Sequence, residues 1–192
     1  MKILFSILII LVLSACKQQT TTRVVDDGYG LLYSVTSQQQ NVDKLLWVKD
    51  PGADIRAWVE QIAAFNQEVT KQLEAWKASG QVTSLSTLGL PPAEIEARER
   101  ATKRTTGELL FSTDVNLRLS LVVAQLKALG YCSDLCYAIA QETKDDGIQE
   151  IAKKWEERFK ELNAAGMKLL ETPAVTTPQP KPVSVPSAPQ HH

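Results

Sequence analysis

Apolar side chains recur every three or four residues through the middle of the chain, which is the spacing of one face of an α-helix. The clearest run begins after Asp50-Pro51, an N-cap followed by a proline at the first helical position, and ends at Gly80. Its apolar positions are Ile55, Trp58, Ile62, Phe65, Val69, Leu73 and Trp76. The pattern predicts a long helix with one face in a core.

Two further stripes predict two more core helices. One contains Ile148, Ile151, Trp155, Phe159, Leu162 and Leu169. Gly166 lies within this stripe, at a position where a neighbouring helix could approach closely. The other helix is expected to begin at Thr113 or Asp114 and to stop at Gly130. It carries Val115, Leu119, Val122, Leu126 and Leu129.

A weaker stripe near the N-terminus and a polar segment complete the predicted elements. Leu31, Val35, Val42 and Leu45 or Leu46 fit a helix, although "GLLYSVTS" could instead form a strand. Pro91-Pro92 opens the charged stretch "AEIEARERATKRTTGEL", which predicts a surface helix. Because no strong hairpin signal is present, we expect an all-α fold, an antiparallel four-helix-type bundle with an extra polar surface helix.

The first residues have the anatomy of a signal peptide. Lys2 is followed by the apolar run from Ile3 to Leu13 and by the small residues Ser14 and Ala15. As a helix this run spans roughly 16 Å, about half of a ~30 Å hydrocarbon core, which is too short for a stable transmembrane helix. Residues 1–15 are therefore predicted to be removed.

Leu13-Ser14-Ala15-Cys16 resembles the lipobox of bacterial lipoproteins. The resemblance implies that Cys16 is lipidated, with acyl chains such as palmitate, and becomes the anchored first residue of the mature chain. A soluble secreted protein cut near Ala15 is the alternative. Lys17, where some lipoproteins have aspartate, is similar to the outer-membrane sorting pattern of Gram-negative lipoproteins. The expected location is the periplasmic side of the outer membrane, with a Gram-negative host assumed.

Composition divides the rest of the chain. Residues 16–28 are polar and predict a lipidated tether, residues 29–171 the helical bundle domain, and residues 172–192 a disordered proline-rich tail. The tail ends in His191 and His192, the only histidines, and two adjacent terminal histidines make a poor fixed metal site. The formal net charge of −1 gives no sign of a nucleic-acid surface.

Cys132 and Cys136 form a pair four residues apart, directly after Gly130. If Cys16 is lipidated, an even number of cysteines remains in an oxidising compartment, which suits a structural disulfide. Cβ atoms four apart in a regular helix are about 5 to 6 Å apart, whereas a disulfide needs roughly 3.8 Å. The bond therefore requires Cys132 in a loop or first turn, where it would fix a bend between helices. Buried thiols, a redox pair and a metal site are the alternatives, but redox enzymes of the thioredoxin kind use Cys-x-x-Cys.

Two segments also resemble a family of periplasmic ferritin-like four-helix domains of unknown function. They are "DPGADIRAWVEQIAAFNQEVTKQLEAWKASGQVT" and "TKDDGIQEIAKKWEERFKELNAAGMKLL", and the likeness extends over roughly residues 29–171. The family commonly carries a histidine after an aspartate in the first segment, where this chain has Phe65-Asn66. No histidine occurs between Cys16 and Gln190. The predicted bundle therefore contains none of the Glu-x-x-His pairs that bind a di-iron centre.

Sequence motifs of common enzymes are missing. The chain has no phosphate loop, no Gly-x-Ser-x-Gly elbow and no His-Glu-x-x-His zinc helix. We therefore expect no enzyme activity, no catalytic residue, no metal and no cofactor. The expected partners are the membrane, through the lipid anchor, and another envelope protein, for which the chain acts as a non-catalytic binding or scaffold component. The alternatives are an accessory lipoprotein of a secretion or conjugation system, an immunity or exclusion factor, and a ferritin-like stress or metal-handling protein.

Overall fold

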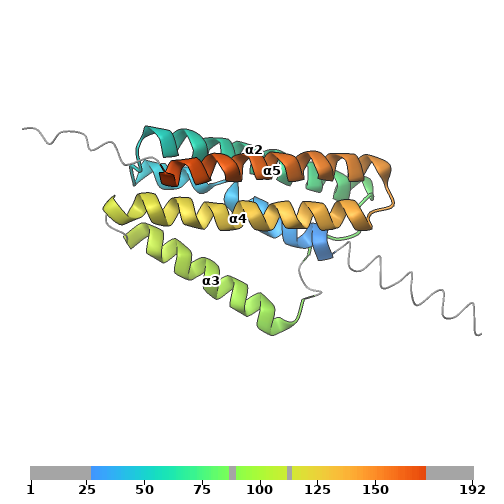
Figure 1. Ribbon diagram of the computed structural model, residues 1–192. Helices are drawn as coiled ribbons and strands as arrows, with labels where there is room; N and C mark the ends of the chain where they lie inside the picture. Colours follow the sequence, from blue (N-terminus) through green and yellow to red (C-terminus); the bar gives the residue numbers. More distant parts are fainter. Residues whose placement is uncertain (1–26, 87–89, 112–113, 172–192) are drawn as a thin grey trace, which may run out of the picture.

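The computed structural model describes residues 27–86, 90–111 and 114–171, which form an all-α bundle (Figure 1). Helical residues 27–39 are followed by η1 (Val42–Trp47), α2 (Ala53–Ser79), α3 (Pro92–Phe111), α4 (Asp114–Glu142) and α5 (Asp146–Glu171). No strand occurs in these three ranges, and the all-α prediction is confirmed. The predicted signal peptide, Cys16 and the proline-rich tail lie outside the described residues.

α5 lies along α2 in the antiparallel direction. Near the start of α2, Trp58 Nε1 donates a hydrogen bond to the carbonyl of Leu162 (2.8 Å), and near the end of α2 the Trp76 ring packs on Trp155 (5.1 Å between centroids). The close approach predicted at Gly166 is confirmed, since a Cβ there would lie 2.3 Å from Trp58 Cζ2. Trp58, Trp76 and Trp155 are all buried, as their stripes predict.

Residues 27–39 pack antiparallel to the C-terminal half of α2. Tyr29 contacts the ring of Trp76 edge-on. About two helical turns further along, the hydroxyl of Thr36 accepts a hydrogen bond from Thr70 of α2 (3.0 Å). The strand alternative for "GLLYSVTS" is wrong, because residues 30–37 are helical. The helix does not continue to Leu46, which lies in the separate helix η1. Residues 27 and 28, which we assigned to the tether, are also helical.

The start of α2 differs from the prediction, whereas its end agrees. The helix begins at Ala53 with Gly52 as N-cap, so the predicted cap at Asp50 is wrong by two positions. Gly52 has a φ of 99°, a conformation that glycine adopts without steric cost, and its N–H donates to Asp50 Oδ1 (3.1 Å). The side chain of Asp50 therefore orders the turn that precedes the helix. Gly80 is the left-handed C-cap that the sequence predicts.

α4 does not stop at Gly130 but continues to Glu142. A glycine inside a helix costs about 1 kcal/mol relative to alanine. The residues beyond it bury Cys132, Cys136 and Ile139 in the core, and each buried apolar side chain contributes at least as much. The predicted helix end at Gly130 is therefore wrong, and α4 packs antiparallel to α5 over most of its length (Figure 1).

The buried face of α4 is also rotated from the predicted one. Leu119, which we placed in the stripe, is 58% exposed, and Leu117 and Leu121 are buried in its place. Val122 and Leu129 are buried as predicted. The helix is apolar on several sides, so its spacing alone does not identify the face that packs.

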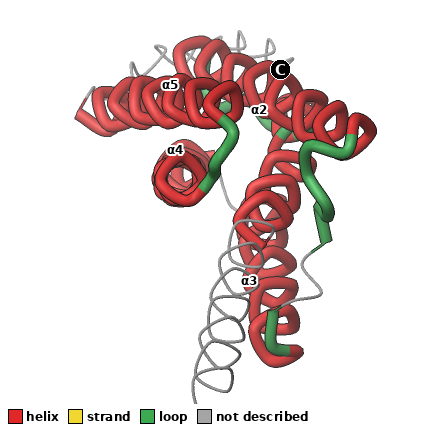
Figure 2. The backbone as a smooth tube through the Cα atoms, turned by 90° about the vertical axis from the view of Figure 1, so that its right-hand side faces the viewer, coloured by secondary structure: helices red, strands yellow, loops and turns green. Residues whose placement is uncertain are grey.

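α3 is the polar surface helix that the sequence predicts. None of its residues is buried, and three Arg or Lys side chains pair with a Glu four positions earlier. Figures 1 and 2 show α3 leaving the bundle near the start of α4 and diverging from it toward its own N-terminus. Arg98 nevertheless reaches α4, where it donates to the hydroxyl of Tyr131 (2.9 Å).

Candidate functional site

The first feature is one end of the bundle, at which several helices begin or end. The starts of α2 and α4 are joined by Arg118, whose guanidinium donates to Asp54 through Nη1 (2.9 Å to Oδ1) and Nη2 (2.6 Å to Oδ2). Arg56 near the start of α2 donates to the carbonyl of Leu46 (3.4 Å), which brings the end of η1 to the same place. The ends of α3 and α5 lie there too (Figure 1).

This end carries most of the large apolar side chains that are exposed in the described residues. They are Trp47, Val48, Leu110, Phe111, Leu119, Met167 and Leu170, which we call the apolar end. Trp47 is 80% exposed and Phe111 is 89% exposed. Among the described residues only Tyr137, in the second half of α4, is large, apolar, exposed and elsewhere. Exposed apolar groups concentrated in this way are typical of interaction surfaces.

The described chain begins at the opposite end of the bundle. A Cβ on Gly28 would lie 3.3 Å from Cγ1 of Ile139, close to the end of α4. Residue 27 and the apolar end are therefore separated by the length of the bundle (Figure 1).

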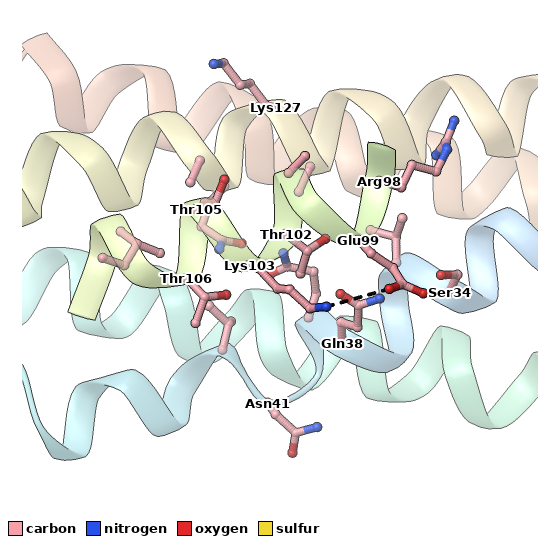
Figure 3. A pocket seen from close by; sticks show the side chains of 18 of the residues that line it. Ser34, Gln38, Asn41, Arg98, Glu99, Thr102, Lys103, Thr105, Thr106 and Lys127 are labelled. Atoms are coloured by element: carbon pink, nitrogen blue, oxygen red, sulfur yellow. Dashed lines mark ion pairs between the residues drawn. The ribbon is translucent and has the colours of Figure 1, made fainter. Parts of the chain in front are cut away.

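The second feature is a cleft of about 960 Å³ between α3 and the rest of the bundle. Its walls are helix 27–39, η1, the inner face of α3 and the outer face of α4 (Figure 3). About half of the lining side chains are aliphatic, among them Leu31, Val35, Leu45, Ile95 and Leu109. A cleft of this size is within the range of small-molecule sites.

Neutral polar groups line the mouth of the cleft. Thr102, Thr106 and Gln38 lie around an ion pair between Lys103 Nζ and Glu99 Oε2 (3.7 Å), as Figure 3 shows. Lys127 points away from the cleft in the same view. Lys44 also lines the cleft and, like Lys127, forms no ion pair with another described residue, so the lining has an excess of positive charge.

Two buried side-chain carbonyl oxygens in residues that line the cleft have no hydrogen-bond partner among the described residues. They belong to Gln125 of α4, which is only 2% exposed, and to Gln39 at the end of helix 27–39. In both, the carbonyl oxygen Oε1 has no donor within reach. Asn66 Oδ1 on the buried face of α2 has no partner either, so an unpaired carbonyl oxygen is not particular to the cleft.

The cysteine pair lies in the interior of α4, not in a loop. Cys132 and Cys136 are both buried and both free thiols, so the disulfide considered above is not formed. The regular helix explains this, because it holds the two Cβ atoms too far apart. Burial raises the pKa of Cys132 to about 12 and, with the neighbouring Cys132 and Glu156, that of Cys136 well above its ordinary value. Thiols of this kind are weak nucleophiles and serve as core side chains.

The remaining predictions concern metals and membranes. Within the described ranges, no three His, Cys, Asp or Glu side chains come together as a group that could hold a metal ion. Within the same ranges, Leu117–Glu142 of α4 is long and apolar enough to cross a membrane. Of the most apolar stretch of that segment, 44% is buried inside the bundle, and a core helix of a soluble protein satisfies the same criterion. Cys16 and the two histidines lie outside the described residues.

Comparison of the chain with protein families, with characterised proteins and with solved structures finds no match. The resemblances to lipoproteins and to ferritin-like domains therefore stay predictions. Sequence reasoning did not find the apolar end or the cleft, because both depend on how separate elements meet. The available signals were weak: Trp47 lies outside the main stripes, and Phe111 is an apolar residue at the end of a polar helix.

Proposed function

We propose that the protein is a lipid-anchored lipoprotein on the periplasmic side of the outer membrane, and that it binds another envelope protein without catalysis. The observation that carries this proposal is the position of the apolar end, at the opposite end of the bundle from residue 27. A lipid on Cys16 would reach the bundle through residues 17–26, at the end where Gly28 packs. The apolar end would then face away from the anchoring membrane.

The chemistry of this end suits a protein partner. Exposed tryptophan and phenylalanine side chains are the types that contribute most at protein interfaces. Charges of both signs border them, including exposed Asp50, Arg104 and Glu108. A surface that binds anionic lipids would instead be predominantly basic. We therefore assign the apolar end to an envelope protein with a complementary apolar face.

The anchor is tested by Cys16→Ser in the native host. We expect loss of metabolic labelling with palmitate and release of the protein from the membrane fraction, because a serine hydroxyl cannot replace the acylated thiol. Cys132→Ser is the matched control and should keep both label and membrane association, since that thiol is buried in α4. A Cys16→Ser protein that still carries label and stays with the membrane would overturn the lipoprotein assignment.

The docking surface is tested by a photo-crosslinking amino acid placed in the full chain in living cells. Positions Trp47 and Phe111 sample the apolar end, and Tyr137, which is 55% exposed near the other end, is the matched control. We expect the same partner to be captured from positions 47 and 111 and not from position 137. Equal capture at all three positions, capture of lipid alone, or capture of a second copy alone would each overturn the proposal.

The identity of the captured partner also distinguishes between the more specific functions that the sequence suggests. A component of a secretion or conjugation system would make the protein an accessory subunit of that machine, and a toxin or incoming transfer apparatus would make it an immunity or exclusion factor. A structural envelope protein leaves the scaffold function as proposed.

A further inference from the structure

The cleft beside α3 and the apolar end form one continuous surface. Val48, which follows η1, and Leu110, near the end of α3, line the cleft and also belong to the apolar end. Trp47 and Phe111 lie beyond the cleft lining. A small ligand confined to the cleft would therefore leave these two rings exposed, whereas a protein segment could cover the cleft and the rings together. We call the combined surface the extended groove.

α3 forms one long wall of the extended groove. Its 20 residues span about 30 Å. Ile95, Thr102, Thr106 and Leu109 lie along one face of this helix and line the cleft. No residue of α3 is buried, although a helix ordinarily packs one face against another element. Because α3 diverges from the bundle (Figure 2), a further helix laid between them would bury this face.

The lining of the cleft has an excess of positive charge. Glu99 is the one acidic residue among the lining residues, and it pairs with Lys103 (3.7 Å). Lys44 of η1 and Lys127 of α4 are exposed, belong to different walls and form no ion pair with another described residue. Their long, flexible side chains allow both ammonium groups to reach carboxylates on a bound helix. Residues 172–192 of the chain itself do not complement this charge, because they contain a lysine and no acidic residue.

We propose that the extended groove receives an acidic amphipathic helix of the envelope partner. The apolar face of that helix packs between α3 and the bundle and continues over the apolar end, and its flanking Asp or Glu side chains pair with Lys44 and Lys127. This inference rests on the proposed function, since it names the part of the partner that binds and the charge that it carries.

A photo-crosslinking amino acid at Thr102, placed in the full chain in living cells, tests the location. Thr102 lines the cleft from α3, and Ala97, which is exposed on α3 but does not line the cleft, is the matched control. We expect position 102 to capture the protein that positions 47 and 111 capture, and position 97 not to capture it. Mass spectrometry should map the crosslink to a segment with apolar residues every three or four positions and more acidic than basic residues.

Charge reversal tests the recognition. Lys44→Glu, combined with the crosslinker at position 102, should lower the crosslink yield about three- to tenfold, because a carboxylate then faces the acidic flank of the helix. Lys71→Glu, on the exposed side of α2 and outside the cleft lining, is the matched control and should leave the yield unchanged. Thermal unfolding of each purified variant confirms that it is folded.

The outcomes separate this inference from the proposed function. Capture of a partner at positions 47 and 111 but not at position 102 would overturn the bound helix and leave the docking function in place. The inference also fails if position 102 captures a lipid, a second copy or a segment with a basic excess, or if Lys44→Glu leaves the yield unchanged. No capture at positions 47 and 111 would instead contradict the docking function itself.

Discussion

Arg118 holds both carboxylate oxygens of Asp54, at 2.9 and 2.6 Å, and so two residues that are 64 positions apart in the chain join the starts of α2 and α4. The hydrogen bond from Arg118 lowers the pKa of Asp54 below its ordinary value, and burial opposes this only in part. Asp54 keeps 42% of its side chain exposed, and solvent screening limits the pair to less than about 1 kcal/mol. Because two guanidinium nitrogens bond to two carboxylate oxygens, the pair fixes the relative orientation of the two side chains more strictly than a single hydrogen bond would.

Acid should remove the contribution of the Asp54–Arg118 pair. Because the pKa of Asp54 is lower in the folded than in the unfolded state, its contribution is complete at neutral pH. The stabilisation is lost as the pH falls from about 4, the pKa of Asp54 in the unfolded chain, to below its lower pKa in the folded protein. Urea unfolding should show Asp54→Asn less stable than the wild type by less than about 1 kcal/mol at neutral pH, with a smaller gap near pH 3.

Glu60→Gln is the control for that measurement, since Glu60 is exposed on α2 and has no ion pair with another described residue. Its effect should be smaller than that of Asp54→Asn at neutral pH. A gap between wild type and Asp54→Asn that is the same at both pH values would contradict the assignment.

Gly166→Ala should destabilise the protein, because the new Cβ would lie 2.3 Å from Cζ2 of the buried Trp58. Trp58 is held in place by its hydrogen bond to Leu162, so it cannot move away cheaply. Overpacking of this kind costs about 1 to 3 kcal/mol. Thermal or urea unfolding measures the loss. Gly107→Ala on α3, with nothing within 4 Å of the added Cβ, is the matched control and should be neutral or stabilising.

Cys132 and Cys136 should resist alkylation in the folded protein. Both thiols are buried and their pKa values are raised, to about 12 for Cys132, so little thiolate forms at neutral pH. Iodoacetamide followed by peptide mapping should leave the peptide with both cysteines unmodified without denaturant and modify it fully in urea. A cysteine introduced at exposed Ser79 is the positive control. Rapid native labelling of Cys132 or Cys136 would support a redox role instead.

The helical character of the chain and the buried faces of α2 and α5 could be predicted from the local sequence pattern. The stripes of α2 and α5 are amphipathic, so spacing alone places Trp58 and Phe159 in the core. α4 is apolar on several sides, and there the buried face depends on which neighbours are present, as exposed Leu119 shows. The cleft was not predictable, because its lining residues come from helix 27–39, η1, α3 and α4, which meet only in the folded chain.

Gly130 shows how tertiary packing overrides a local helix stop. Its helix continues because the following turns are buried, and the nearest atom to an added Cβ is Asn163 Nδ2 at 3.9 Å, an ordinary contact. Gly130→Ala should therefore stabilise the protein by about 0.5 to 1 kcal/mol, because alanine restricts the unfolded chain and favours the helix. A rise in the urea midpoint with an unchanged m-value measures this effect. A loss of stability would instead mean that Gly130 is needed for close packing of α4 on α5.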